Sequence, residues 1–515
     1  MKETIKRKQS IWNNNISFFS LLIFLTIIIS CIGSFLNWQV TYTKINPITG
    51  GLEQSIVAVE NLLSKDGLRS IIGHSVTNFM NYTPLTLIIV ALIGIGIAHK
   101  SGLLQVLFHL LGEHLSKYWL TFIIVFLGII SSFSSDVGYI ILLPLAALFF
   151  LANNRNPIIG IFAAFASVGL GYSINFFAGI IDYSLAPYTE MAGLLIDESY
   201  QMSIYGNIFF LISSSIALTL FLTYLTESVI APRIPKYKYD GDLIIDEIII
   251  TKKEKRGLFL AGVGFFVLFL MVIYMFIPGL PASGLLLDLT EESYLGQLFG
   301  GNAYFNQSIV YLISLLLGLC GWLYGIGAKT IKNVEDLSKT ISNSLNNIGH
   351  LLLLTFLASQ FIAIFKQTNL GTIITIWLMN LIETLDFVSL PLIILFFFFV
   401  AITNKFLVSS VTKWALISPV IVPLFMKANI TPEFTQSIFR LGESVSNIIT
   451  PLLPYFVIFI GFIQIYNKGE EIMPFTKCFK LLLIYVLSVT ALWLFIIISW
   501  YVINLPLGIN IYPTV

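Results

Sequence analysis

Long apolar runs recur along the whole chain and constrain its fold more than any other feature. Segments such as LLIFLTIIIS and LIILFFFFVAI contain no charged residue, and a helix of about 20 such residues is what crosses the hydrocarbon core of a membrane. Charged residues make up 11% of the chain, against roughly 25% in an average soluble protein, and the mean hydropathy is +0.89. The sequence therefore predicts an all-α polytopic membrane protein and excludes a soluble enzyme with one buried core.

Other protein classes are disfavoured by charge, cysteine usage and motifs. The net charge of +1 provides no basic field, so no nucleic-acid partner is expected. Cys31, Cys320 and Cys478 are scattered, which predicts neither a disulfide framework nor a cysteine-based metal site. The chain has no Gly-x-Ser-x-Gly elbow and no phosphate-binding Gly-Lys-Ser/Thr loop. We therefore expect no enzyme, and any transport should be driven by an ion gradient.

The start of the chain, MKETIKRKQ followed by an apolar run from Ile16, resembles a secretory signal. The run is about 20 residues long and no small-x-small cleavage site follows it, so a retained signal anchor is the preferred interpretation. The string ending at Cys31 also resembles a lipoprotein cleavage site. The later hydrophobic segments favour the anchor.

Lys and Arg in short loops indicate the cytoplasmic side of a membrane protein. The tail of residues 1–15 and the loop of residues 229–256 are rich in both, and are expected inside. The stretches 182–203 and 279–306 contain neither, and are expected outside. Placing the apolar segments between these loops predicts nine spans, with the N-terminus inside and the C-terminus outside. The spans lie near residues 16–38, 83–98, 157–181, 204–228, 257–278, 307–326, 350–384, 432–466 and 480–501.

Two apolar segments fit no simple crossing. Residues 119–152 are flanked by cytoplasmic charges on both sides and are too short for two crossings, which predicts a re-entrant hairpin with its tip at Ser131–Asp136. Residues 388–427 form two apolar arms around a polar tip and predict a second hairpin that enters from the opposite face. The expected organisation is a first half at 16–228, a linking helix pair at 257–326, a second inverted half at 327–467 and a last transmembrane helix at 480–505.

A faint internal repeat supports this organisation. Ser131 to Pro144 and Ser410 to Pro423 share a Ser followed thirteen residues later by Pro-Leu. Each hairpin precedes a Pro-started crossing that carries a polar patch ending in Asn, namely Asn175 or Asn447. Opposed hairpins and broken helices are typical of inverted-repeat secondary transporters, which bind substrate and ion at the breaks.

Charges at membrane depth are costly and are therefore functional candidates. Asp136 lies at the first hairpin tip, while Lys405 and Lys413 bracket the second. Arg440 and Glu443 are three residues apart and share a helix face, so they either neutralise each other or belong to a translocation site.

Polar residues near the breaks supply further candidates. Asp182 lies at the outer end of its crossing, where it is either an interfacial aspartate or part of a site. Trp414 is either an aromatic wall for a ring-bearing substrate or a packing residue. The candidates for a coupling ion, which we expect to be Na⁺ or H⁺, are Ser135, Asp136, Asn175, Ser410 and Asn447, with Asn175 and Asn447 as the possible Na⁺ positions and no firm metal site.

Several strings match a known family in order and spacing. The most specific are Ser135-Asp136-Val137-Gly138-Tyr139, Thr412-Lys413-Trp414-Ala415-Leu416, Arg440-Leu441-Gly442-Glu443-Ser444 and Asn447-Ile448-Ile449-Thr450-Pro451. From about Asn46 to about Tyr466 the chain resembles the AbgT family of p-aminobenzoyl-glutamate transporters, whose members also include exporters of sulfonamide antimetabolites.

The resemblance implies a homodimer whose subunits each have nine spans and two opposed hairpins. It also implies functional positions, which fall on Asp182, Asn404, Trp414, Pro432, Arg440 and Pro451. Two positions depart from the family pattern: Glu443 replaces an aspartate, and Val411 replaces a serine. Substrate selectivity is therefore less constrained than fold.

The combined hypothesis is a secondary active transporter in the cytoplasmic membrane of a bacterium. It would move p-aminobenzoyl-glutamate or a related aromatic carboxylate, with Arg440 holding a carboxylate, Trp414 stacking on the ring, and Asp182 and Glu443 serving the coupling ion. The alternative is a proton-driven efflux pump for sulfonamide-type drugs, which uses the same residues. An intramembrane enzyme or a passive channel would need a catalytic cluster or a continuous polar stripe, and neither is apparent.

Overall fold

Helices dominate the structure. The computed structural model describes residues 15–45, 51–134, 136–237, 250–346, 348–385, 387–467 and 473–514. Within these ranges the one sheet is a hairpin of β1 (Gln39–Ile45) and β2 (Leu52–Ala58), which pair antiparallel from Gln39 opposite Ala58 to Ile45 opposite Leu52. The prediction of an all-α polytopic membrane protein is confirmed.

Eight helices of the described ranges are long and apolar enough to cross a membrane. Each of them also exposes apolar side chains, most of all α10 (Lys252–Tyr274), where Phe266 is 60% exposed. Such exposed apolar surface is what contact with lipid requires. The eight helices span Asn15–Phe35, Lys65–Lys100, Lys117–Ser134, Ile208–Arg233, Lys252–Tyr274, Phe305–Ala328, Gly349–Gln367 and Phe475–Ile503.

Each of the nine predicted spans coincides with a helix or with two helices in succession. The six spans that coincide mainly with one long helix correspond to α1 (Asn15–Phe35), α3 (Thr83–Lys100), α9 (Ile208–Leu225), α10, α12 (Phe305–Ala328) and α20 (Phe475–Ile503). The other three are built from α7 (Pro157–Leu170) and α8 (Ile180–Gly193), α14 (Gly349–Gln367) and α15 (Leu370–Glu383), and α18 (Pro432–Asn447) and α19 (Phe456–Tyr466).

The two predicted hairpins correspond to helix pairs with interrupted tips. The first comprises α5 (Lys117–Ser131), the 3₁₀ turn η2 (Ser132–Ser134), the π-helical turn η3 (Gly138–Leu142) and α6 (Leu143–Ala152). The second comprises α16 (Ser389–Thr403) and α17 (Ser410–Lys427). In both halves the hairpin is followed by a broken helix and then by a long one, α9 or α20. The first arm, Lys117–Ser134, is itself one of the eight helices long enough to cross a membrane. That the two helix pairs are re-entrant, and the sides from which they enter the membrane, stay predictions.

One expected loop is a helix. Residues 182–203 were expected to lie outside the membrane after a crossing that ends near 181, but α8 occupies Ile180–Gly193 and packs along α17. Leu185, Thr189 and Ala192 of α8 are completely buried. The absence of Lys and Arg that suggested an outer loop therefore reflects burial of this helix against the second half of the chain.

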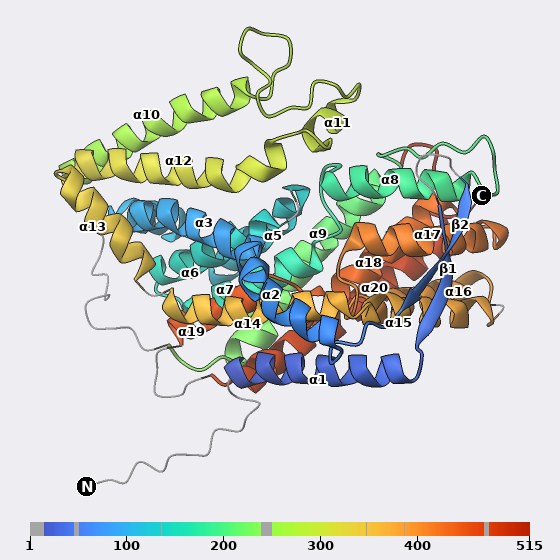
Figure 1. Cartoon of the computed structure of the whole chain (residues 1–515). Coiled ribbons are helices and arrows are strands. Elements are labelled where there is room, and N and C mark those ends of the chain that lie inside the picture. The colour runs from blue at the N-terminus through green and yellow to red at the C-terminus, as the bar shows by residue number, and fades with distance from the viewer. Residues whose placement is uncertain are drawn as a thin grey trace.

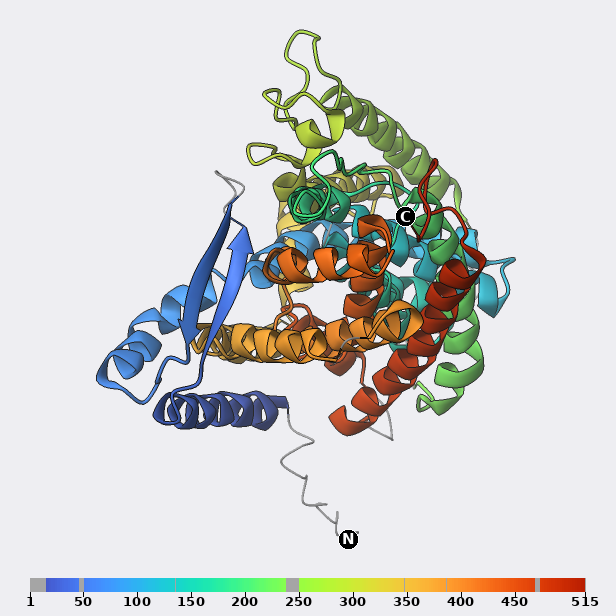
Figure 2. The ribbon, with the colours of Figure 1, turned by 90° about the vertical axis from the view of Figure 1, so that its right-hand side faces the viewer.

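Several shorter elements were not foreseen, because each is too short or too polar to register as a span. They are α2 (Lys65–Met80), η4 (Thr226–Ile230), η5 (Ala231–Arg233), α11 (Tyr294–Phe299), α13 (Val334–Leu345) and the β-hairpin. The helix α4 (Leu103–Gly112) also lies outside the predicted spans. Figure 1 shows α10 and α12 as a pair at one edge, with α13 leading back to the other helices and α1 at the opposite edge. Seen from the side, the β-hairpin lies with α1 and α2, away from α10 and α12 (Figure 2).

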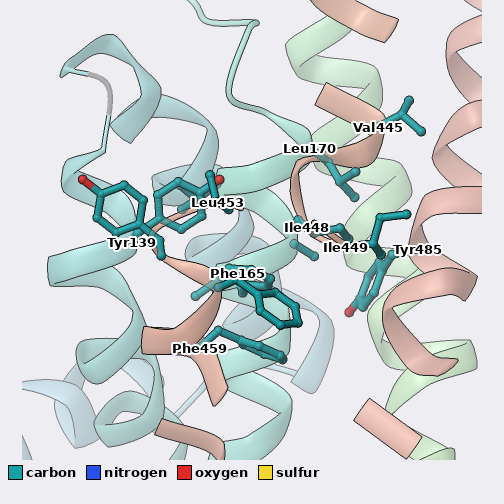
Figure 3. Close-up of a cluster of buried hydrophobic side chains, with 14 of the residues drawn as sticks. Tyr139, Phe165, Leu170, Val445, Ile448, Ile449, Leu453, Phe459 and Tyr485 are labelled. Carbon is teal, nitrogen blue, oxygen red and sulfur yellow. The ribbon is translucent and has the colours of Figure 1, made fainter. Parts of the chain in front are cut away.

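The two broken helices meet at their interruptions. Asn156 caps α7 by accepting the amide of Ile158 (3.0 Å), and the helix ends before Gly171. After α18 the chain carries Pro451 and Pro454, and proline cannot continue a helix without losing a backbone hydrogen bond. Figure 3 shows the apolar contact between the interruptions, where Leu170 of α7 lies near Ile448 and Tyr139 near Leu453.

Candidate functional site

The helix α18 carries two charged residues of the candidate site, Arg440 and Glu443, and all of its side chains are buried. It begins at Pro432, whose fixed φ suits the first helical position. Its polar residues face neighbouring helices of both halves, because α18 packs against α7, α8, α16, α17 and α20. A helix with polar residues and no exposed face can persist in a membrane protein only if those groups find partners.

Arg440 finds its partner in the first half of the chain. Nη1 of Arg440 donates to Oδ1 of Asp182, and the side chains are only 2% and 4% exposed. Oδ2 of Asp182 accepts the amide of Gly179 at 2.8 Å, so the carboxylate also caps the first turn of α8. Asp182 is therefore a buried residue at a helix break, and its placement at the outer end of a crossing is wrong.

Glu443 finds its partner in the second hairpin. Its Oε1 lies 3.0 Å from Nζ of Lys413 on α17, and both side chains are completely buried. The interpretation in which Arg440 and Glu443 neutralise each other along one helix is wrong, because each pairs with a residue of another element. One helical turn of α18 thus holds two ion pairs, one to each half of the chain.

Asn404 joins the second pair to the break in α18. Its Oδ1 accepts from Nζ of Lys413, and its Nδ2 donates to the backbone oxygen of Glu443 (2.9 Å), to Ser446 (3.1 Å) and to Oδ1 of Asn447 (2.8 Å). Asn447 in turn donates to the backbone oxygen of Gly169 on α7 at 3.5 Å. The network connects the second hairpin, α18 and α7.

Trp414 is locked in place by α8. Its Nε1 donates to Oγ1 of Thr189 at 2.9 Å, and Nε2 of Gln436 donates to the same oxygen at 2.8 Å. The indole ring is completely buried and lies 4.6 Å from the ring of Phe439. In this conformation Trp414 packs and positions α17 against α8, which favours the packing alternative over an open aromatic wall.

The coupling-ion candidates are distributed over separate places. Asn175 donates to Ser132 (3.1 Å) and to the backbone oxygen of Ile130 (3.2 Å), which fixes the break after α7 to the first hairpin. The hydroxyl of Tyr455 donates to Asp136. Ser410 begins α17, and its buried hydroxyl has no hydrogen-bond partner among the described residues. Ser135 lies outside the described residues.

The remaining candidates shape the backbone. Pro432 begins α18, and Pro451 lies in the break between α18 and α19. Lys405 is exposed, unlike Lys413, so the two lysines that bracket the second tip differ in environment. Val411 is partly buried near the start of α17.

Sequence reasoning missed two features. Thr189 is an uncharged residue in a region expected to be a loop, and Gln436 is one of many polar residues on its helix. Nothing in the sequence therefore distinguishes either residue from its neighbours. The pairing of Lys413 with Glu443 had a signal, since a lysine inside an apolar hairpin needs a counter-ion, but its partner lies thirty positions away.

The chain is similar in sequence to known proteins. Residues 3–515 match the model of the "AbgT putative transporter family". The p-aminobenzoyl-glutamate transport protein of Escherichia coli (strain K12) is 28% identical over 495 residues, which cover 96% of this chain and 94% of that protein.

Two solved structures are similar. The YdaH transporter of Alcanivorax borkumensis is 30% identical, with 96% of this chain and 100% of that one covered and a TM-score of 0.49. MtrF of Neisseria gonorrhoeae, described with a class of antimetabolite efflux pumps, is 31% identical, with 97% of each chain covered and a TM-score of 0.48. The match to the family model spans nearly the whole sequence, and the chain therefore belongs to the AbgT family of transporters.

Proposed function

We propose that this transporter moves p-aminobenzoyl-glutamate or a related aromatic carboxylate across the cytoplasmic membrane of a bacterium, driven by a proton gradient. The observation that carries the proposal is the state of Arg440. Its Nη1 is engaged by Asp182, yet its Nε is buried without a hydrogen-bond partner among the described residues. A buried, unsatisfied guanidinium donor costs free energy, and a substrate carboxylate would satisfy it.

The coupling proton would be taken up by buried carboxylates. Asp182 and Glu443 each compensate the charge of one buried cation. If a substrate anion binds such a cation in place of its carboxylate, that carboxylate must bind a proton or remain an unpaired buried charge. Sodium was the other expectation. The side-chain oxygens of Asn175 and Asn447 already accept hydrogen bonds from Phe176 and Asn404, at 2.7 and 2.8 Å, which favours packing roles for both residues.

The alternative is efflux of sulfonamide-type antimetabolites. A sulfonamide drug carries no carboxylate, and its ionised sulfonamide group lacks the planar pair of oxygens that a guanidinium binds in bidentate geometry. The unpartnered Nε of Arg440 therefore favours the aromatic carboxylate.

The family resemblance implies a homodimer, and the distribution of Lys and Arg predicts an N-terminus inside and a C-terminus outside. Crosslinking in native membranes tests the dimer. Labelling of single cysteines at positions 10 and 512 with an impermeant reagent tests the orientation, with modification only at position 512 in intact cells as the expected result.

Uptake into proteoliposomes tests the function. We expect labelled p-aminobenzoyl-glutamate to accumulate under an imposed pH gradient and not under a Na⁺ gradient alone. Accumulation under Na⁺ alone would overturn the proton coupling, and movement of a sulfonamide without movement of the carboxylate would overturn the substrate.

Variants of the Arg440–Asp182 pair separate binding from folding. Removing one partner leaves a buried charge and is expected to lower protein yield. The neutral double variant Asp182→Asn/Arg440→Gln should restore the yield but still fail to bind the carboxylate. Normal binding by the double variant would show that the pair is only structural. Arg233→Ala, at an exposed arginine of η5, is the matched control.

A further inference from the structure

Two cations lie in the candidate site, and each is already neutralised. Arg440 pairs with Asp182, and Lys413 pairs with Glu443 at 3.0 Å. Arg440 and Glu443 are three residues apart on α18 and therefore share a face of that helix. The site as a whole is electrically neutral, so an anion with two carboxylates would add two uncompensated buried charges unless protons entered with it.

Lys413 is suited to a role that changes during transport. A lysine ammonium has three N–H donors, and Asn404 and Glu443 each accept one from Lys413. Unlike a guanidinium, the ammonium recognises an anion as a compact point charge and can exchange one carboxylate for another without a bidentate geometry. Asn404 would keep the ammonium in position during such an exchange, because its own amide is anchored to the backbone oxygen of Glu443.

Glu443 is suited to the complementary change. Its Oε2 is completely buried and has no hydrogen-bond partner among the described residues, so the carboxylate depends on Lys413 for the compensation of its charge. If Lys413 turns to a substrate, a proton on Glu443 is the least costly way to avoid an unpaired buried anion.

Other ionisable groups around this pair are engaged elsewhere or stand apart. The helices α7 and α16 contain none. On α8, Asp182 pairs with Arg440, and the other ionisable residues are not completely buried, namely Tyr183, Tyr188 and Glu190. On α18, Glu433 accepts a hydrogen bond from Tyr200. On β1, Lys44 pairs with Glu53, and Tyr42 is partly exposed. On α20, the hydroxyl of Tyr485 is hydrogen-bonded to Thr226. The remaining ionisable residues of α20 lie near its two ends, namely Lys477, Cys478, Lys480 and Tyr501.

We propose that Lys413 is a second carboxylate-binding cation, which the substrate takes from Glu443 as Glu443 takes up one proton. The transporter would therefore select aromatic acids with two carboxylates over those with one. This inference rests on the proposed function, in which Arg440 binds the first carboxylate. The one bond formed is the O–H bond of Glu443, whose proton comes from solvent, and the second carboxylate of the substrate replaces Glu443 at Nζ of Lys413.

Two ligands that differ by one carboxylate test the inference on the purified, full-length protein. p-Aminobenzoyl-glutamate has two carboxylates and p-aminobenzoyl-glycine has one. Wild type should bind the glutamate compound at least about tenfold more tightly, since a charge-assisted hydrogen bond supports that discrimination. Calorimetry in two buffers of different ionisation enthalpy should show one more proton taken up with the glutamate compound.

Variants assign both effects to Lys413. Lys413→Gln leaves Glu443 buried and unpaired and could fail to fold, so the neutral double variant Lys413→Gln/Glu443→Gln is measured as well. In the double variant we expect the ratio of the two affinities to fall to within about twofold and the extra proton to disappear. Lys427→Gln, at the exposed last residue of the same helix, should keep the wild-type ratio.

The outcomes separate the two proposals. An unchanged affinity ratio and proton uptake in the double variant would overturn the role of Lys413, and so would equal affinities of wild type for both compounds. Binding of neither compound by wild type would overturn the proposed function itself, and this inference with it.

Discussion

A single hydroxyl joins three helices in the candidate site. Oγ1 of Thr189 on α8 accepts from Trp414 on α17 and from Gln436 on α18. If this hydroxyl is removed, both donors lose their acceptor. A buried donor without an acceptor destabilises the folded state by more than its hydrogen bond had stabilised it. This residue therefore fixes the indole of Trp414 more firmly than its uncharged side chain suggests.

Thr189→Val should lower the free energy of unfolding by about 1–2 kcal/mol, because it leaves two buried donors without their acceptor. Thr189→Ser should restore most of the loss. Reversible unfolding in mixed micelles measures both. The control is Thr490→Val, since the hydroxyl of Thr490 bonds only the backbone of its own helix (2.7 Å) and its loss should cost less than about 0.5 kcal/mol. Equal costs at the two positions would contradict this assignment.

At the scale of the elements, the broken helices depend on a close approach of the side chain of Ile448 to the backbone of α7. A Cβ at Gly169 of α7 would lie 2.2 Å from Cγ2 of Ile448 and 3.2 Å from the hydroxyl of Tyr139. The side chain of Ile448 is β-branched and stiff, so it cannot move aside at small cost. Figure 3 shows Tyr139 and Ile448 in this crowded region.

Gly169→Ala should therefore destabilise the protein by about 1–3 kcal/mol through overpacking. Ile448→Ala removes the clashing methyl group, so the double variant should lose less than the sum of the two single variants in a double-mutant cycle. Gly262→Ala on α10 is the control, because a Cβ there meets nothing within 4 Å and alanine is the better helix former. Additive costs would show that the two helices do not couple at this contact.

At the scale of the whole molecule, buried ion pairs hold distant segments together. Besides the two pairs of the candidate site, Arg155 between α6 and α7 donates to both carboxylate oxygens of Glu227 on η4, at 2.7 and 2.8 Å. Thr121 of α5 donates to the same carboxylate. The guanidinium lies 4.5 Å from the ring centre of Phe150. This cluster fastens the base of the first hairpin to the end of α9.

Arg155→Gln should cost about 3–5 kcal/mol of stability, because Glu227 is only 1% exposed and would remain charged without a cation. The neutral variant Arg155→Gln/Glu227→Gln should recover most of that loss. By contrast, Lys339→Gln should change stability by less than about 0.5 kcal/mol, since its pair with Glu335 is more than half exposed on each side. Thermal unfolding in detergent compares the stability of Arg155→Gln, Arg155→Gln/Glu227→Gln and Lys339→Gln. Similar losses of stability in Arg155→Gln and Lys339→Gln would contradict the expected effect of burial.

The sequence by itself determined where the apolar helices lie and where several of them are interrupted. A bilayer sets the length of each span and forces every backbone group to pair within its own segment, so spans and hairpins depend mainly on local composition. That is why all nine predicted spans and both predicted hairpins coincide with helices. The sequence also identifies charged candidate residues such as Arg440 and Glu443, because a charge within a membrane segment is costly and therefore rare.

Only the tertiary structure decided which groups meet. Arg440 pairs with Asp182 across 258 positions, and Glu443 pairs with Lys413. The spacing on α18 also allowed Arg440 and Glu443 to pair with each other, which they do not. The helix α8, interpreted as a loop from its lack of basic residues, is helical and buried because α17 covers it. The partner of a charge depends on which helices pack together, and that packing is a property of the whole chain and not of any local run of residues.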